Sequence, residues 1–187
     1  MTAAATIDAM QAEADMRRWL ERAVIGLNLC PFAKAVHVKG QVHLAACAAD
    51  DVPGVIENLD AEISDLLALE PSRRDTTLLA VPRGFDEFLL FNDLVRQGER
   101  LLQRRKLGGV LQLASFHPAF VFAGAGEGDM ANFSNRSPRP TLHLLREESM
   151  DRAVAAFPEA EAIYETNIRT LERLGPVGWR ALGTGRS

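Results

Sequence analysis

Apolar residues recur every three or four positions along much of the chain, a spacing that is typical of helices with one buried face. The helices that this spacing predicts cover residues 6–28, 52–69 and 84–105, a short stretch that begins near Ser149, and a last stretch from Pro158 to Gly175. Proline is favoured in the first turn of a helix and glycine just beyond its last turn, which sets the boundaries of the last helix.

Short apolar runs separate these helices and predict buried β-strands. The runs cover residues 35–47, 76–82, 108–116 and 141–147. In the first run, apolar residues alternate on both sides of Gly40, and we interpret this run as one strand with a glycine bulge. Strands that alternate with helices along a chain favour parallel pairing through right-handed crossovers.

The order of these elements predicts an α/β fold. We expect a single-domain sandwich with a four-stranded, mostly parallel sheet and flanking helices, or a mixed sheet if the last strand runs antiparallel. The domain is expected to cover residues 16–182. Residues 1–15 are expected to form an N-terminal helical extension that can fray, and residues 183–187 a disordered tail.

A long segment without periodicity precedes the last strand. Residues 117–140 are rich in glycine, proline and polar residues. Structureless segments of this length inside a compact domain are usually functional. We therefore expect a functional loop here, in which residues 119–134 can close over a ligand.

Composition narrows the possible partners. The 187 residues are 47% hydrophobic and 25% charged, with a net charge of −4, so no overall basic character points to nucleic acid. No apolar run reaches the roughly 20 residues of a membrane span, and no signal-peptide pattern is present. Two cysteines are too few for a disulfide framework, which favours a cytoplasmic location with free thiols. The N-terminal helix leaves a homo-oligomer possible.

Cys30 is the first candidate for chemistry, because it directly precedes Pro31. Proline at the start of a short helix would place Cys30 at the N-cap. The positive end of the helix dipole lowers the pKa of a thiol there and makes it a better nucleophile. The alternative is a small buried side chain, which is a frequent role of free cysteine.

His117 is the second candidate, because it follows a predicted strand directly. The carboxyl ends of strands in open α/β sheets are common ligand sites. The ordinary pKa of histidine, near 6.5, suits a general acid or base at neutral pH. The alternative is a histidine that holds the following loop through hydrogen bonds.

Polar residues with anion-binding chemistry follow the long loop. Asn135, Arg136 and Ser137 offer an amide, a guanidinium and a hydroxyl, a set that suits a carboxylate or a phosphate. The alternative for Arg136 is a residue that fixes the loop by binding backbone carbonyls. His143 and Arg146 lie on the last predicted strand, where alternation places them on opposite faces unless the strand ends by Leu145.

A metal site has less support from the sequence. No CxxC, HxH or HExxH pattern is present, so every ligand would come from a different element. Cys30, His117 and His143 remain an alternative set of metal ligands, whereas His37, His43 and Cys47 are expected to be structural. No nucleotide-binding motif is present either, so no cofactor is indicated.

Four strings in this order and spacing resemble a known family: "LNLCPFAKAV", "SFHP", "NRSP.P" and "LHLLRE". The family is an uncharacterised group of bacterial and plastid proteins, domain of unknown function 1415 (DUF1415), and the resemblance extends over about residues 16–182. It implies no reaction, cofactor or substrate. The motif positions that it implies are Cys30, Pro31, His117, Pro118, Asn135, Arg136, Ser137, Pro138, His143 and Arg146.

These observations favour an enzyme that acts on a small anionic metabolite. Arg136 would bind a carboxylate or phosphate, with Ser137, Asn135, His143 and Arg146 as further binding residues. His117 would be the acid or base and Cys30 the nucleophile of a transferase or hydrolase. The alternatives are a metal-binding protein and a non-catalytic binding or assembly module.

Overall fold

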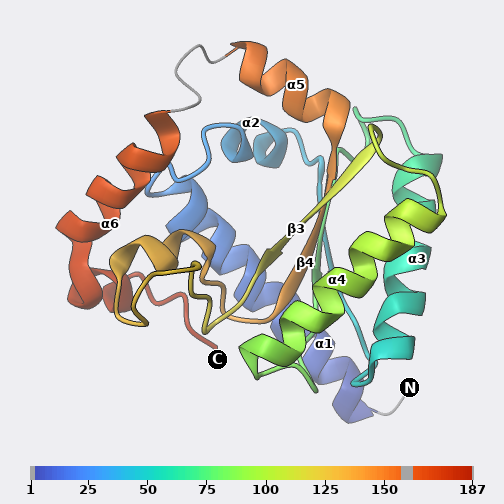
Figure 1. The fold of residues 1–187 in the computed structure, drawn as a ribbon, viewed down its shortest axis with the longest axis horizontal. Coiled ribbons are helices and arrows are strands. Elements are labelled where there is room, and N and C mark those ends of the chain that lie inside the picture. Colours follow the sequence, from blue (N-terminus) through green and yellow to red (C-terminus); the bar gives the residue numbers. More distant parts are fainter. Residues whose placement is uncertain (1–2, 157–161, 187) are drawn as a thin grey trace.

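The computed structural model describes residues 3–156 and 162–186 (Figure 1). The elements are α1 (Ala3–Trp19), η1 (Leu20–Ile25), α2 (Ala33–Val38), β1 (Val42–Ala46), α3 (Val52–Ala68), β2 (Thr76–Ala80), α4 (Phe88–Arg104), β3 (Leu111–Phe116), η2 (Met130–Asn135), β4 (Thr141–Arg146), α5 (Glu147–Ala156) and α6 (Ala162–Ala181). η1 is a π-helical continuation of α1, and η2 is a 3₁₀ helix. Among the described residues, no helix combines the length and apolar character needed to cross a membrane.

One four-stranded sheet lies at the centre of the fold, with the strand order β1-β2-β4-β3. β1 pairs with β2 in parallel, whereas β4 pairs antiparallel with both β2 and β3. The predicted α/β class is therefore confirmed, and the sheet is mixed because the last strand runs against the other three. The long segment between β3 and β4 lets the chain reverse and enter the middle of the sheet.

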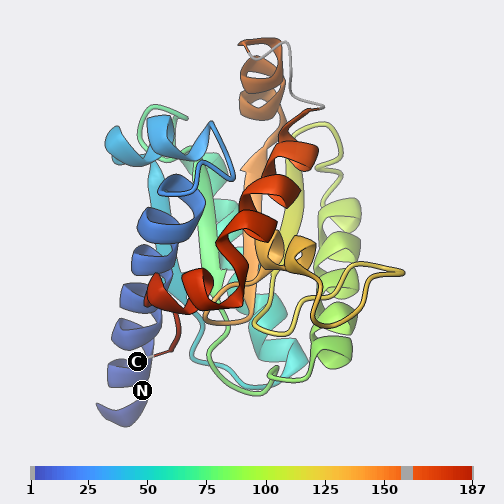
Figure 2. The ribbon, with the colours of Figure 1, turned by 90° about the vertical axis from the view of Figure 1, so that its left-hand side faces the viewer.

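Helices cover both faces of the sheet (Figures 1 and 2). α3 and α4 pack on one face through a core that includes Leu59, Phe91 and Leu144. α1 and η1 pack on the other face, where Trp19 and Leu78 belong to a second core. α6 lies beside η2, and α5 projects beyond the end of the sheet (Figure 2). Each face thus has its own apolar layer, and the strands separate the two.

The helices with the clearest periodicity are confirmed. α3 covers nearly all of the predicted 52–69 segment, and the Asp51 side chain caps it by accepting a hydrogen bond from the Gly54 amide at 3.0 Å. α4 begins at Phe88, later than the predicted residue 84. Gly84 has a φ of 81°, so the chain turns there before the helix begins.

The strand predicted over residues 35–47 is wrong in its first half, because residues 33–38 form α2. Gly40 is not a bulge: with a φ of 69° it ends this helix. The Gly40 amide donates to the His37 carbonyl and the Gln41 amide to the Val36 carbonyl, both at 2.9 Å. This pair of bonds is a Schellman motif, which terminates helices at a left-handed glycine.

The last helix differs from the prediction at its C-terminal end. Its predicted start at Pro158 lies outside the described residues. Gly175, with a φ of 62°, interrupts the helix as expected, but a second helical segment continues to Ala181.

The ends of the described chain pack on the domain. Ala12 and Asp15, in the segment predicted as an extension, are fully buried in the structure. Near the other end, Thr184 is buried, and the Arg186 side chain donates to the Pro138 carbonyl at 2.9 Å. Both segments therefore contact the residues that lead into β4, through Asp15 with Arg139 and through Arg186 with Pro138.

Candidate functional site

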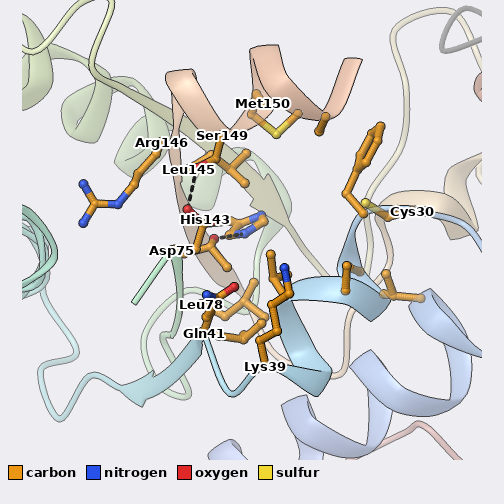
Figure 3. A pocket seen from close by; sticks show the side chains of 18 of the residues that line it. Cys30, Lys39, Gln41, Asp75, Leu78, His143, Leu145, Arg146, Ser149 and Met150 are labelled. Carbon is orange, nitrogen blue, oxygen red and sulfur yellow. Dashed lines mark hydrogen bonds between the residues drawn. The ribbon is translucent and has the colours of Figure 1, made fainter. Parts of the chain in front are cut away.

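A cavity of about 620 Å³ opens on the α1 face of the sheet (Figure 3). Its floor is formed by β2 and β4, and its walls by η1, α2 and α5. Most of the lining side chains are apolar, among them Leu20, Val36, Leu78, Phe116 and Met150. Polar side chains also line the cavity, namely Cys30, Lys39, Gln41, Ser72, Asp75, Thr76, His143, Arg146, Ser149 and Arg152. This composition is typical of a small-molecule site.

The strands place their polar residues in the cavity through simple alternation. Successive side chains of a strand point to opposite faces of the sheet. His143 therefore faces the cavity, whereas its neighbours Leu142 and Leu144 belong to the core under α3 and α4. Thr76 on β2 lies diagonally across from His143, since Leu78 is the residue that pairs with His143 in register.

His143 is the best-defined polar group of the cavity. Its Nε2 lies 2.7 Å from the Thr76 hydroxyl oxygen, and that hydroxyl donates to the Leu144 carbonyl at 2.7 Å. A threonine hydroxyl has one proton, so Nε2 must be the donor in its bond with Thr76. Nδ1 is then the basic atom of the ring, and it has no hydrogen-bond partner among the residues that the structure describes. Desolvation lowers the pKa of His143 to about 4, so the ring is neutral at pH 7.

Cys30 lines the same cavity and is only partly buried. The predicted N-cap position is wrong, because α2 begins at Ala33 and its N-cap is Phe32. A turn over residues 30–33 precedes the helix, and in this turn the Ala33 amide donates a hydrogen bond to the Cys30 carbonyl at 3.2 Å. Helix-dipole activation of the thiol is therefore not supported. Cys47, by contrast, is fully buried, and burial raises the pKa of its thiol.

Basic side chains outnumber acidic ones around the cavity. The charged residues that line it are Lys39, Arg146, Arg152 and Asp75, which is three basic groups against one acidic group. Asp75 accepts a hydrogen bond from the Ser149 hydroxyl at 2.5 Å, and Arg152 pairs with Glu148. Lys39 has no side-chain partner within residues 3–156 and 162–186, and it extends from the end of α2 toward the cavity (Figure 3).

His117 lies elsewhere and does not line this cavity. It is fully buried, its Nε2 donates to the Phe85 carbonyl at 3.0 Å, and its Nδ1 accepts from the Ala119 amide at 3.0 Å. Its ring stacks on Phe91 with 5.2 Å between centroids. Burial lowers the pKa of His117, and both ring nitrogens are occupied. The structure therefore separates His117 from Cys30, and this histidine holds the start of the loop.

The Asn135–Ser137 motif also makes internal contacts. Arg136 donates to the Phe120 carbonyl at 3.2 Å and to the Glu127 carbonyl at 2.6 Å. The Ser137 hydroxyl donates to the Arg139 carbonyl at 2.6 Å, and Asn135 accepts from the Ser134 hydroxyl at 3.1 Å. None of residues 119–134 lines the large cavity. The motif thus fixes the long loop, and the loop does not cover this cavity.

Arg146 points away from His143, as strand alternation predicts (Figure 3). One of its terminal nitrogens donates to the Leu66 and Leu69 carbonyls, both at 2.6 Å. These carbonyls belong to the end of α3, where helices leave unpaired acceptors. Arg146 is therefore a cap for α3, although it also borders the cavity.

The alternative metal site is not assembled. Within the described part of the chain, no three His, Cys, Asp or Glu side chains come close enough to hold a metal ion. Cys30 and His143 share the cavity, but His117 lies outside it. The other two histidines each lie near one glutamate. The distance is 3.3 Å from His37 Nε2 to Glu21 Oε1 and 3.7 Å from His43 Nε2 to Glu62 Oε2.

Sequence reasoning missed Lys39, Asp75 and the Thr76 partner of His143. The strand predicted over residues 35–47 includes Lys39, whereas in the structure this residue ends α2 beside the cavity. The Thr76–His143 contact depends on the register between β2 and β4. Alternation in each strand could have placed both residues on one face, but no pattern in the sequence gives the register.

One comparison with known proteins gives a match. A family model with the description "Protein of unknown function (DUF1415)" matches residues 11–181. No curated protein matches the chain significantly, and no solved structure does.

Proposed function

Because the chain belongs to the DUF1415 family, whose description assigns no activity, we propose a function from the large cavity. The protein is an enzyme that acts on a small, mainly apolar molecule with one anionic group. His143 takes the role of the base, and Lys39 pairs with the anion. Compared with the roles expected from the sequence, His143 replaces His117 and Lys39 replaces Arg136.

The observation that carries the proposal is the environment of His143. Thr76 and the Leu144 carbonyl fix the proton on Nε2 and leave Nδ1 as an acceptor beside an apolar cavity. A neutral imidazole that is held in one tautomer is the form that a general base requires. His117, by contrast, has both ring nitrogens bound to the backbone.

The charge around the cavity supports an anionic substrate. Arg146 and Arg152 have partners in the protein, so Lys39 is the cation best able to accept a new one. Lys39 is an exposed residue that lines the cavity, so its ammonium group is accessible to a carboxylate or a phosphate. The apolar lining then accommodates the rest of the molecule.

The proposed reaction is transfer or hydrolysis at an electrophilic carbon. His143 Nδ1 accepts the proton of a bound water molecule or hydroxyl group. At the same time, the oxygen of that water or hydroxyl forms a bond to the electrophilic carbon. The imidazolium then returns this proton to the leaving group as the old bond breaks. The Cys30 thiol lies in the same cavity and is the second candidate nucleophile, with the same base as its proton acceptor.

Anion binding in the large cavity is tested by the rate at which Cys30 is alkylated. We expect hexanoate and hexyl phosphate to slow alkylation of Cys30 by iodoacetamide more than hexanol does, because only the first two pair with Lys39. Mass spectrometry separates Cys30 from the buried Cys47, which serves as an internal control. Lys39→Gln should abolish the preference for anions, whereas Lys34→Gln, on the exposed side of α2, should preserve it. Equal protection by hexanol and hexanoate would contradict the role of Lys39.

Catalysis is tested with the carboxylate-bearing ester mono-4-nitrophenyl glutarate. Glutamine at position 143 can keep the hydrogen bond to Thr76 but supplies no base. His143→Gln should therefore lower kcat by about 10²–10⁴-fold with little change in KM. Unchanged kcat in this variant would rule out His143 as the base.

A binding module without catalysis is the second candidate. The low pKa of His143, about 4, makes it a weak base but leaves Nδ1 a good hydrogen-bond acceptor. Protection of Cys30 by anions without ester turnover in the unmodified protein would favour this second function over the first.

A further inference from the structure

A second, smaller pocket of about 310 Å³ lies between the long loop and the last residues of the described chain. Its lining residues come from α1, the loop, α6 and the segment after α6, and they include Trp19, Phe133, Arg136, Trp179 and Arg186. Only Trp19 also borders the large cavity. The two sites are therefore separate, and the role of this pocket is independent of the proposed function.

Hydrogen bonds hold the two walls of this pocket together. The Trp19 indole nitrogen donates to the Arg136 carbonyl at 2.9 Å, and the Arg186 Nε donates to the Pro138 carbonyl at 2.9 Å. Arg22 also donates to the Leu182 carbonyl at 3.1 Å. A pocket whose walls are fixed in advance binds a ligand at a lower entropic cost.

Aromatic rings form one side of the pocket. Phe133 and Trp179 contact each other edge to face, with 5.1 Å between ring centroids. The guanidinium of Arg136 lies over the Phe133 ring at 4.3 Å. Planar apolar surfaces of this kind accept another ring through stacked or edge-to-face contact.

Two arginines of the pocket have N–H groups that are available to a ligand. A guanidinium carries five N–H groups. Arg136 uses its Nε and one terminal nitrogen for the Phe120 and Glu127 carbonyls. Arg186 uses its Nε for the Pro138 carbonyl and one terminal nitrogen for Asp86. The other terminal nitrogen of each has no hydrogen-bond partner in residues 3–156 and 162–186, and no acidic side chain lines the pocket.

We propose that this pocket binds an aromatic carboxylate. The carboxylate accepts hydrogen bonds from Arg136 and Arg186, and the ring packs against Phe133 and Trp179. Hydrogen bonds between a guanidinium and a carboxylate are among the strongest in proteins.

The electrostatics of Arg136 agree with this proposal. Burial lowers the pKa of Arg136, because desolvation disfavours its charged form. An anion bound beside the guanidinium would offset this cost. A neutral ligand of the same shape would not.

The tryptophans make the test direct. The chain has two, and both line this pocket, so intrinsic fluorescence reports on its occupancy. Trp19 also borders the large cavity, so variants are needed to assign the signal to one site. We expect benzoate to change the emission saturably. Benzamide, which has nearly the same shape but no charge, should bind at least tenfold more weakly. Equal affinities, or no saturable change with benzoate, would overturn the proposal.

Three variants locate the binding. Arg186→Gln should weaken benzoate binding at least tenfold, whereas Arg173→Gln, an exposed arginine of α6 outside the pocket, should leave it unchanged. Lys39→Gln removes the cation proposed to bind anions in the large cavity, so saturable benzoate binding that persists in this variant belongs to the smaller pocket. Loss of benzoate binding in Lys39→Gln, or full binding in Arg186→Gln, would assign the signal to the large cavity and refute this site.

Arg136 needs a milder change, because its side chain also fixes the loop. Arg136→Lys keeps the positive charge but loses the planar fork. We expect weaker benzoate binding with an unchanged far-UV circular dichroism spectrum. Unchanged affinity in this folded variant would also count against the proposed site.

Discussion

At the scale of single residues, two histidines with similar sequence contexts have different environments. His117 and His143 both lie at or near a strand of the sheet, and burial lowers the pKa of each. His117 is bound through both ring nitrogens to its own surroundings, whereas His143 uses only Nε2. The sequence identified both as candidates. It could not distinguish them, because the difference lies in the partners that other elements supply.

We predict that the protein loses stability as the pH falls from about 6.5 to about 4. An unfolded histidine has a pKa near 6.5, and the fold lowers the pKa of His143 to about 4. Between these values the unfolded chain binds more protons than the folded one, so acid favours unfolding. His143 alone accounts for about 3 kcal/mol of lost stability at the lower end. Urea unfolding at several pH values measures the loss.

The variant His143→Gln provides the control. It should show a shallower dependence of stability on pH over the same range. The dependence that remains includes the contribution of His117, whose pKa is lowered as well. An identical pH dependence in the variant and the unmodified protein would show that His143 is not held neutral by the fold.

At the scale of elements, long amphipathic helices could be predicted and short elements could not. α3 has enough turns for its apolar stripe to be unambiguous. In α2, Val36 and Val38 alternate as they would in a strand, and six residues are too few to show the helical period. The left-handed glycine at position 40 fits a bulge and a helix end equally well. Only its hydrogen bonds distinguish the two.

We predict that Gly40→Ala destabilises the protein by about 1–2 kcal/mol, because alanine is strained at a φ of 69°. A clash with residues beyond its two chain neighbours is not the cause, since a Cβ at Gly40 would meet no such atom within 4 Å. Chemical denaturation measures the change. The matched control is Gly108→Ala, which also meets no atom within 4 Å but has no positive φ. Equal losses in both variants would contradict the Schellman assignment.

At the scale of the whole molecule, a buried ion pair joins α1 to the segment that leads into β4. Arg139 donates to Asp15 from two nitrogens, at 3.1 Å and 2.9 Å. Both side chains are buried. No pattern in the sequence indicates this contact, because the two residues lie far apart along the chain and each is a common surface residue. Such long-range pairs depend on the order of the strands in the sheet. The sequence did not predict that β4 lies between β2 and β3.

We predict that Asp15→Asn destabilises the protein by about 3–5 kcal/mol, because it removes the buried carboxylate charge that pairs with both Arg139 and Arg18. The buried Arg139 then keeps only the longer contact with Asp8, at 3.8 Å, among the ion pairs of the described residues. Asparagine has nearly the same size, so the change isolates the charge. Asp65→Asn, at an exposed position of α3, should change stability by no more than about 0.5 kcal/mol. Thermal unfolding compares the two. A small loss in Asp15→Asn would mean that the pair contributes little.

The central position of β4 has a consequence for synthesis on the ribosome. β1, β2 and β3 are made first, but the first two cannot join β3 until residues 141–146 have left the exit tunnel. Until then, the facing edges of β2 and β3 expose unpaired backbone groups, which are templates for aggregation. The nascent chain therefore carries a gap between these edges from the synthesis of β3 until β4 has emerged. Closure of that gap requires contacts between residues far apart in sequence, which slows folding.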